Sequence, residues 1–329
     1  MAELTPGRYE GDSGAWDAFV EEADNGTLFH RLSFLDYHGE RFAAQANHVA
    51  WTKGDALHAL MPLGLFEEEG GLVARSPFGA SYGGIVTRRD LSFHRARELV
   101  GSLVTYLREL GVRKLIVTPP PKLCFEHPHD YLEFHLLKEG AACVVSELTS
   151  YIPVQEDPLP GFRHAAVKAI RKARANGVRV ETNDAVDDFY PILKANRDAL
   201  GVVPTHSAEE IRWLLKHLPD DIKLFMAYKD DVAIAGSLVF RVNRRAILDF
   251  YWAHLSEYQA LRPVSLLVYE ITRWAARNGH RWFDFGTHTL RMIPQEGSTR
   301  FKETFGAVGA FRSTYELELS ARASAPAAR

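Results

Sequence analysis

The chain has 329 residues, of which 46% are hydrophobic and 25% are charged, and its formal net charge is −3. This composition is typical of a soluble globular protein, and the length predicts two domains rather than one core. The slightly negative net charge excludes an overall basic surface of the kind that binds nucleic acid. No apolar run approaches the roughly 20 residues that cross a bilayer. The N-terminus lacks the apolar core of a signal peptide, so we expect a cytoplasmic protein. Two cysteines, Cys124 and Cys143, make neither a disulfide framework nor a metal site, and we expect both to be buried and no metal to be bound.

The first half of the chain predicts helices and strands in alternation. The long helix is indicated by apolar residues at helical spacing, such as Ala96, Leu99 and Leu103. The predicted order is helices at 16–23 and 28–42, strands at 48–53, 56–66 and 72–78, a helix at 92–110, a strand at 114–121, a helix at 130–140 and a strand at 143–154.

The second half repeats this order. It predicts helices at 162–176, 187–200 and 208–218, a meander of strands at 222–228, 232–242 and 246–252, a helix at 261–278, and strands at 281–286 and 311–317. In the strand 246–252, alternation predicts Leu248, Phe250 and Trp252 on one face, with Asp249 and Tyr251 on the other.

The strand–helix–strand unit in the second half predicts a parallel crossover, because parallel strands need a long connection. Ligands of such sheets bind at the carboxyl ends of the strands. The repeated order predicts an α/β fold of two domains, each a mixed sheet flanked by helices. We expect the first domain at 1–157 and the second at 158–319, with a turn-rich boundary at 155–160 and a flexible tail at 320–329.

Several segments resemble one family. They are SEYQALRPVSLL (256–267), WAARNGHRWFDFG (274–286), GSTRFKETFGA (297–307), AIRKARANGVRVE (169–181) and SPFGASYGGIV (76–86). Together they are similar to the GNAT-like acyltransferases related to FemAB, a group that includes peptidyltransferases using aminoacyl-tRNA. The resemblance covers most of the chain and implies two tandem GNAT-like domains and an enzyme that forms amide bonds.

No nucleophile, phosphate-loop or metal motif occurs in the sequence. This favours direct transfer between two bound substrates over a covalent enzyme intermediate. Direct transfer to an amine requires a neutral amine, donors for the tetrahedral oxyanion and alignment of both substrates. We therefore expect no tightly bound cofactor, an acyl donor as co-substrate and a small-molecule amine as acceptor.

The turn before the crossover helix distinguishes between donors. GNAT enzymes bind the CoA pyrophosphate on a glycine-rich loop at this helix N-terminus. Here the corresponding run is 259–264, where Arg262 replaces the first glycine and Pro263 lacks an N–H. This departure favours aminoacyl-tRNA, with tRNA as a partner, and leaves acyl-CoA or an acyl carrier as the alternative. Arg262 is a candidate substrate contact or, alternatively, a solvated residue at the helix start.

Three catalytic candidates lie near the expected strand ends. Lys302 could stabilise the oxyanion or bind a donor phosphate, and it could equally be a surface lysine beside Phe301 and Phe305. Asp284 could orient the acceptor amine or accept its proton, or cap the following turn. Tyr251 is the third and weaker candidate.

Further side chains are candidates for substrate binding. Lys168, Arg171 and Lys172 share one helix side and could meet phosphates, or form an ordinary solvated face. Ser81 and Tyr82 lie in a glycine-rich loop that could line the acceptor cleft or simply connect strands. The remaining candidates are Arg197, His206, Thr287 and Phe305.

The sequence thus predicts an N-acyltransferase that acts on an amine of a sugar, an envelope precursor or a specialised metabolite. The alternative from a different class is a non-catalytic tandem module that binds a small ligand or a partner protein.

Overall fold

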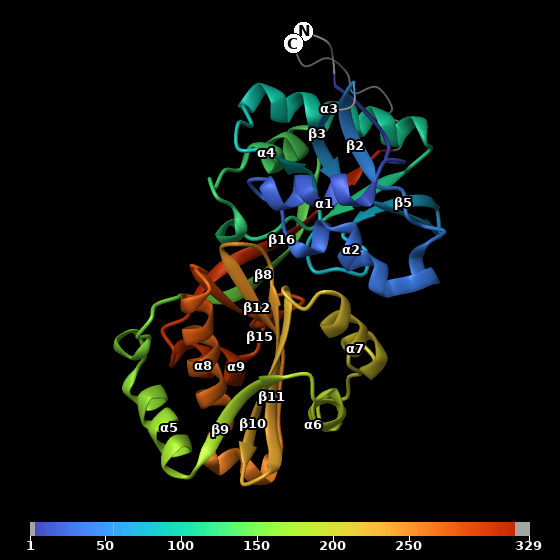
Figure 1. Ribbon diagram of the computed structural model, residues 1–329. Helices are drawn as coiled ribbons and strands as arrows, with labels where there is room; N and C mark the ends of the chain where they lie inside the picture. Colours follow the sequence, from blue (N-terminus) through green and yellow to red (C-terminus); the bar gives the residue numbers. More distant parts are fainter. Residues whose placement is uncertain (1–3, 55, 320–329) are drawn as a thin grey trace. The chain divides into compact units, whose positions relative to one another are not determined.

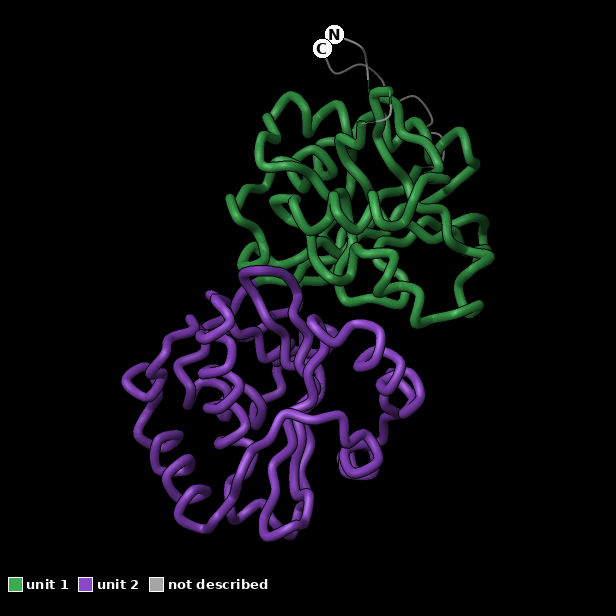
Figure 2. Tube along the Cα trace, viewed as in Figure 1, with its two compact units in different colours: residues 1–146, 311–329 green, residues 147–310 purple. Residues whose placement is uncertain are grey.

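The computed structural model describes residues 4–54 and 56–319 of the chain. It forms two compact units, unit 1 from Met1–Ser146 with Phe311–Arg329 and unit 2 from Glu147–Ala310 (Figure 2). The chain passes between units within strands β8 and β16, whereas the sequence places its boundary in the turn-rich segment 155–160. The predicted flexible tail, 320–329, lies outside the described residues.

Unit 1 contains two sheets. The first has the strand order β1-β2-β3-β6, and the second contains β4-β5-β7-β16. Its strands are β1 (Thr5–Arg8), β2 (Val49–Lys53), β3 (Ala56–Met61), β4 (Gly64–Glu68), β5 (Gly71–Ser76), β6 (Val86–Thr87), β7 (Lys114–Val117) and the end of β16 (Val308–Glu318). Its helices are α1 (Ser13–Glu22), η1 (Leu28–His30), α2 (Leu32–Leu35), η2 (Asp36–Phe42), α3 (Phe93–Glu109), η3 (Lys122–Cys124) and α4 (Tyr131–Lys138).

Unit 2 is built on six strands of a mixed ten-stranded sheet, in the order β8-β13-β12-β11-β10-β9. Its strands are the end of β8 (Ala142–Pro153), β9 (Val178–Asn183), β10 (Ile222–Lys229), β11 (Val232–Arg241), β12 (Ala246–His254) and β13 (Trp282–Thr287), with the small hairpin β14 (Thr289–Leu290) and β15 (Ile293–Pro294). Its helices are η4 (Leu159–Gly161), α5 (His164–Ala175), α6 (Val186–Asp198), α7 (Ala208–His217), η5 (Ser256–Leu261), α8 (Pro263–Arg277) and α9 (Glu296–Glu303). Figure 1 shows α5 and α8 on one side of this sheet and α6 and α7 on the other.

Each unit contains a parallel crossover, which confirms the predicted α/β class. In unit 1, α3 joins the parallel strands β5 and β7; in unit 2, α8 joins the parallel strands β12 and β13. β8 follows the crossover of unit 1 along the chain and pairs in unit 2, and β16 follows the β14–β15 hairpin and pairs in unit 1. In unit 1, β16 pairs with β7 through Tyr315–Glu318, and in unit 2, β8 pairs with β13 through Thr149 and Tyr151–Pro153.

The helix α8 follows its sequence closely. Pro263 occupies the first position, where a missing N–H costs nothing, and Gly279 adopts a φ of 76° just after the end. The apolar stripe of α8 is buried against the sheet, with Leu267, Ile271 and Ala275 at 1% exposure or less. This burial fixes the position of the loop that precedes the helix.

Three local predictions were wrong. The expected single helix at 28–42 is broken into η1, α2 and η2. Arg31 adopts an extended conformation between η1 and α2, and Gly39 takes a φ of 54° that kinks η2. The expected strand at 56–66 divides into β3 and β4, which belong to different sheets, because Pro62 between them has no N–H for a ladder. Cys143 is exposed, whereas Cys124 is buried as expected.

Candidate functional site

The parallel strands of unit 2 open toward their carboxyl ends. β12 and β13 pair at three positions only, from Ala246 with Trp282 to Leu248 with Asp284, although β12 continues to His254. Gly286 on β13 takes a φ of 73°, and β13 pairs irregularly with β8 between Asp284 and Thr287. Backbone groups beyond these pairs are therefore available to side chains, or to a ligand, at this end of the sheet.

A β-bulge in β12 sets which side chains face this opening. Leu238 on β11 pairs with Tyr251 and Val239 pairs with Asp249, so Phe250 is the extra residue. A bulge interrupts alternation and re-aims the side chains beside it. The predicted alternation along β12 was therefore wrong beyond Asp249.

The contacts on each side of the bulge show the result. Trp252 packs on Phe301, with ring centroids 4.9 Å apart, and lies near the ammonium of Lys302. Phe250 instead stacks on Phe240 and, like Tyr251, contacts His206.

Lys302 is the most buried cation of the site. It extends from α9 with 2% exposure, and its Nζ donates to the carbonyl oxygens of Gly286 at 2.9 Å and Thr287 at 2.8 Å. Its ammonium lies 5.9 Å from the centroid of the Trp252 ring. Burial lowers the pKa of Lys302 to about 8, against the opposing effect of Asp284 and Asp249. Lys302 is therefore a fixed internal cation, and two of its three N–H groups hold the end of β13.

Asp284 is also buried, at 1% exposure, and its contacts are those of a turn cap. Its Oδ1 accepts hydrogen bonds from the Thr149 hydroxyl and, at 2.7 Å, from the N–H of Gly286. This geometry matches the alternative given by the sequence, in which Asp284 stabilises the turn after β13. Its charge also supports that of Lys302.

Asp249 is a buried carboxylate that sequence reasoning did not select. It is 7% exposed, and its Oδ1 accepts a hydrogen bond of 2.6 Å from the Ser237 hydroxyl. Burial raises the pKa of Asp249 to about 7, and Asp284 adds to the rise while Lys302 and Ser237 oppose it. A lone acidic residue inside the apolar run AILDFYW was the available sequence signal, because a buried carboxylate needs a reason to be there.

Tyr251 lies in a second buried cluster of unit 2, together with two other predicted residues. Its hydroxyl accepts from the N–H groups of Thr205 at 2.8 Å and His206 at 3.2 Å, and lies 3.1 Å from Nδ1 of His206. The guanidinium of Arg197 sits 5.3 Å from the centroid of its ring. Burial raises the pKa of Tyr251. These bonds attach the segment before α7 to the carboxyl end of β12.

The remaining candidates of unit 2 divide into exposed and buried groups. Lys168, Arg171 and Lys172 are exposed on α5, and none forms an ion pair within the described part of the chain. Arg262 is exposed and adopts a φ of 61°, the left-handed conformation that glycine favours. Phe305 is 1% exposed in the core.

The loop candidates Ser81 and Tyr82 belong to unit 1. Tyr82 is 1% exposed and packs edge-on against Phe29, with ring centroids 5.2 Å apart. Arg312 lies over the Tyr82 ring at 5.0 Å and donates to the carbonyl oxygen of Ser81 at 2.7 Å. Both residues thus have contacts inside their own unit, and their predicted role in acceptor binding stays a prediction.

Within 4–54 and 56–319, no group of three or more His, Cys, Asp or Glu side chains is arranged to hold a metal ion. No helix in the same ranges combines the length and the apolarity needed to cross a bilayer.

Comparison with known proteins identifies the class. Residues 161–303 match the family described as acetyltransferase (GNAT) domain. No curated protein sequence matches the chain. Among solved structures, FemX is similar over 94% of this chain and 97% of its own, with a TM-score of 0.73 and 14% identity.

Two other structures share the fold. The C-terminal domain of a protein described as a lysylphosphatidylglycerol synthetase, from Agrobacterium fabrum, aligns over 92% of this chain and 90% of its own, with a TM-score of 0.60 and 12% identity. A tandem GNAT protein from the clavulanic acid biosynthesis pathway, solved without AcCoA, aligns over 97% of this chain and 99% of its own, with a TM-score of 0.52 and 14% identity.

These findings confirm the predicted tandem GNAT-like fold. Residues 161–303 match the GNAT acetyltransferase family, the chain shares the fold of FemX over most of its length, and the matched part contains Asp249, Asp284 and Lys302.

Proposed function

We propose that this acyltransferase forms an amide by direct transfer of an acyl or aminoacyl group onto an amine, with aminoacyl-tRNA favoured as the donor. The acceptor is an amine of a sugar, an envelope precursor or a specialised metabolite. The observation that carries the proposal is the buried ammonium of Lys302, fixed by two carbonyl groups where the parallel strands β12 and β13 separate.

The reaction needs two charges in opposite roles. The amine nitrogen bonds to the acyl carbon, and the carbonyl oxygen then becomes an oxyanion. In our proposal the remaining N–H of Lys302 stabilises this oxyanion, because a fixed cation in a buried site needs no reorganisation. The bond from the acyl carbon to the donor oxygen or sulfur then breaks, and that atom takes up a proton as it leaves.

We assign the proton of the attacking amine to Asp249. An ionised carboxylate with a pKa near the working pH is suited to accept a proton, and burial raises the pKa of Asp249 to about 7. Asp284 is less suited, since its Oδ1 already accepts two hydrogen bonds that hold the turn. We therefore propose Asp284 as a positioning residue, which maintains the charge of Lys302 and the shape of β13.

Three features favour aminoacyl-tRNA over acyl-CoA. Pro263 offers no N–H at the start of α8, and exposed Arg262 stands where the CoA loop has glycine. Lys168, Arg171 and Lys172 present unpaired charge to solvent, as a phosphate backbone requires. The FemAB-related resemblance points to the same donor. Acyl-CoA is the alternative donor, because the family that matches residues 161–303 is described as an acetyltransferase domain.

A donor-exchange assay tests the proposal. The protein is incubated with a mixture of amine acceptors and either a total aminoacyl-tRNA pool carrying labelled amino acids or labelled acetyl-CoA. We expect labelled amide products from the aminoacyl-tRNA pool, and none with Lys302→Ala. Products from acetyl-CoA alone would reassign the donor. Hydrolysis without amide formation from either donor would contradict the proposed reaction.

A further inference from the structure

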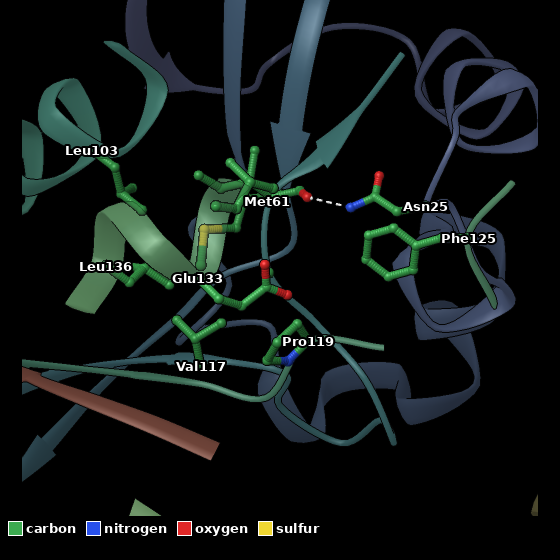
Figure 3. Close-up of a pocket in the computed structure, with 11 residues that line it drawn as sticks. Asn25, Met61, Leu103, Val117, Pro119, Phe125, Glu133 and Leu136 are labelled. Atoms are coloured by element: carbon green, nitrogen blue, oxygen red, sulfur yellow. Dashed lines mark hydrogen bonds between the residues drawn. The ribbon is translucent and has the colours of Figure 1, made fainter. Parts of the chain in front are cut away.

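Unit 1 contains a small apolar cavity into which one carboxylate points. The cavity has a volume of about 20 Å³, and α3, α4 and the ends of β3 and β7 contribute to its walls. Figure 3 shows the Glu133 carboxylate directed into the space between Met61, Val117, Pro119 and Phe125. A volume of roughly 10–15 Å³ is enough for one water molecule, so the cavity holds a group of that size.

The two oxygens of Glu133 have different environments. Oε1 accepts a hydrogen bond of 2.7 Å from Nζ of Lys122. Oε2 is buried and has no hydrogen-bond partner in the described part of the chain, and the whole residue is 7% exposed. A buried carboxylate oxygen without a partner is costly, so a donor that fills the cavity would be stabilised there.

The charges around the cavity favour a cation. Lys122 is shared, since its Nζ lies 2.7 Å from Glu133 and 3.2 Å from Asp130. Two carboxylates thus share one ammonium, which leaves one net negative charge. Phe125 adds an aromatic face, already 4.3 Å from Nζ of Lys122 at its centroid. A second small cation would meet both a free carboxylate oxygen and an aromatic ring.

We propose that unit 1 has a second ligand site, a pocket in which Glu133 binds a primary ammonium group. The ligand class is a small primary amine in its protonated form, because that group is the size of a water molecule and brings both N–H donors and a positive charge. The site is separate from the residues assigned to acyl transfer, and the proposal does not depend on the donor used there.

Methionine labelling gives a direct test, because the chain has 4 methionines and Met61 lines the cavity. With ¹³C-methyl methionine in the full-length protein, methylammonium chloride is titrated against sodium chloride at equal ionic strength. We expect the Met61 methyl signal to shift to saturation, while the signal of Met226, buried in unit 2, stays in place. Methanol has nearly the same size without charge, and tetramethylammonium has the charge without N–H groups or a fitting size.

The relative affinities of the three probes show whether the charge or the size of the ligand decides binding. Methanol should bind at least about tenfold more weakly than methylammonium, a difference of about 1.4 kcal/mol, and tetramethylammonium should leave the Met61 signal unchanged. Glu133→Gln keeps the shape and should weaken methylammonium binding by a similar factor. Glu109→Gln, on the exposed end of α3, should not change it.

Other outcomes overturn the proposal. They are equal effects of methanol and methylammonium, unchanged binding in Glu133→Gln, or no shift of Met61 up to about 0.1 M methylammonium, which would mean that the cavity holds only water. If Glu133→Gln does not fold, Leu136→Phe fills the cavity and leaves the carboxylate. Methylammonium binding that survives in Leu136→Phe would likewise exclude the cavity as the site.

Discussion

The two crossovers of the molecule are built alike and end differently. In unit 1, β5 and β7 pair at four positions, up to their last residues, Ser76 and Val117. In unit 2, β12 and β13 pair at three positions and then separate, while β12 continues to His254. The helix after each crossover carries buried ionisable side chains, Glu133 and His135 on α4 and Lys302 on α9.

Whether the parallel strands stay paired to their ends decides where a reactive site can form in each unit. Strands that stay paired satisfy their own backbone groups, and the buried charge then faces a cavity. Strands that separate leave carbonyl groups unpaired, and Lys302 binds two of them. The separation therefore fixes a cation beside Asp249 and Asp284, whereas the closed pair of unit 1 leaves Glu133 with one free oxygen.

The largest effect is expected from removing the buried cation of unit 2, Lys302. We expect Lys302→Ala to lower kcat by about 10²–10³-fold, the scale for losing one fixed oxyanion donor. KM should change less, because the negative charge develops in the transition state. Steady-state kinetics of amide formation measures both.

Its control is Arg300→Ala, which removes an exposed cation from the same helix. Lys302→Arg should restore activity only in part, because a planar guanidinium places its charge differently. Wild-type turnover in Lys302→Ala would remove the residue from the mechanism and leave backbone N–H groups as oxyanion donors.

The second prediction concerns the proton acceptor of unit 2. Because Asp249 must be ionised to accept a proton and its pKa is raised to about 7, the rate should rise as the pH increases through about 7. Because Lys302 must be charged and its pKa is lowered to about 8, the rate should fall again above about 8. The pH–rate profile of the wild type should thus be a narrow bell.

Asp249→Asn should lower kcat by about 10²-fold and abolish the rise near pH 7, while the fall near pH 8 remains. Ser237→Ala is the comparison variant, since it removes the hydrogen bond to Asp249 and keeps the carboxylate. A bell-shaped profile that persists unchanged in Asp249→Asn would assign the acidic limb to another group.

The third prediction concerns the exposed basic residues on α5 of unit 2. Replacing Lys168, Arg171 and Lys172 together by Ala should weaken tRNA binding and reduce the slope of log K against log salt by up to about 2–3. The free energy of unfolding should change by no more than about 0.5 kcal/mol per substitution, because all three side chains are exposed. An unchanged salt slope would mean that this helix face is only solvated.

The last prediction is that CoA binds only weakly. With Arg262 in a left-handed conformation and no N–H on Pro263, the start of α8 is a poor pyrophosphate site. Calorimetry should give a dissociation constant no tighter than about 1 mM for CoA and acetyl-CoA. Low-micromolar binding would return acyl-CoA to first place as donor.

The amino-acid sequence was sufficient to predict most helices and strands and the α/β fold class. The apolar stripe, Pro263 and Gly279 specify α8 with little outside help, since helix caps and periodicity act within a few residues. The strand–helix–strand pattern places Asp284 near the carboxyl end of β13, and its catalytic role stays a prediction. The segments of FemAB-like appearance include Lys302, whose role also stays a prediction. They also indicated the tandem GNAT-like fold.

Tertiary structure alone decided which side chains meet. One extra residue in β12, Phe250, brings Trp252 near Lys302, because each strand position alternates faces and a single inserted residue reverses them. The exchange of β8 and β16 between the sheets depends on pairing between distant segments, which local periodicity does not encode. Local periodicity also does not encode the contacts of Tyr251, whose hydroxyl accepts hydrogen bonds from the N–H groups of Thr205 and His206 in the segment before α7.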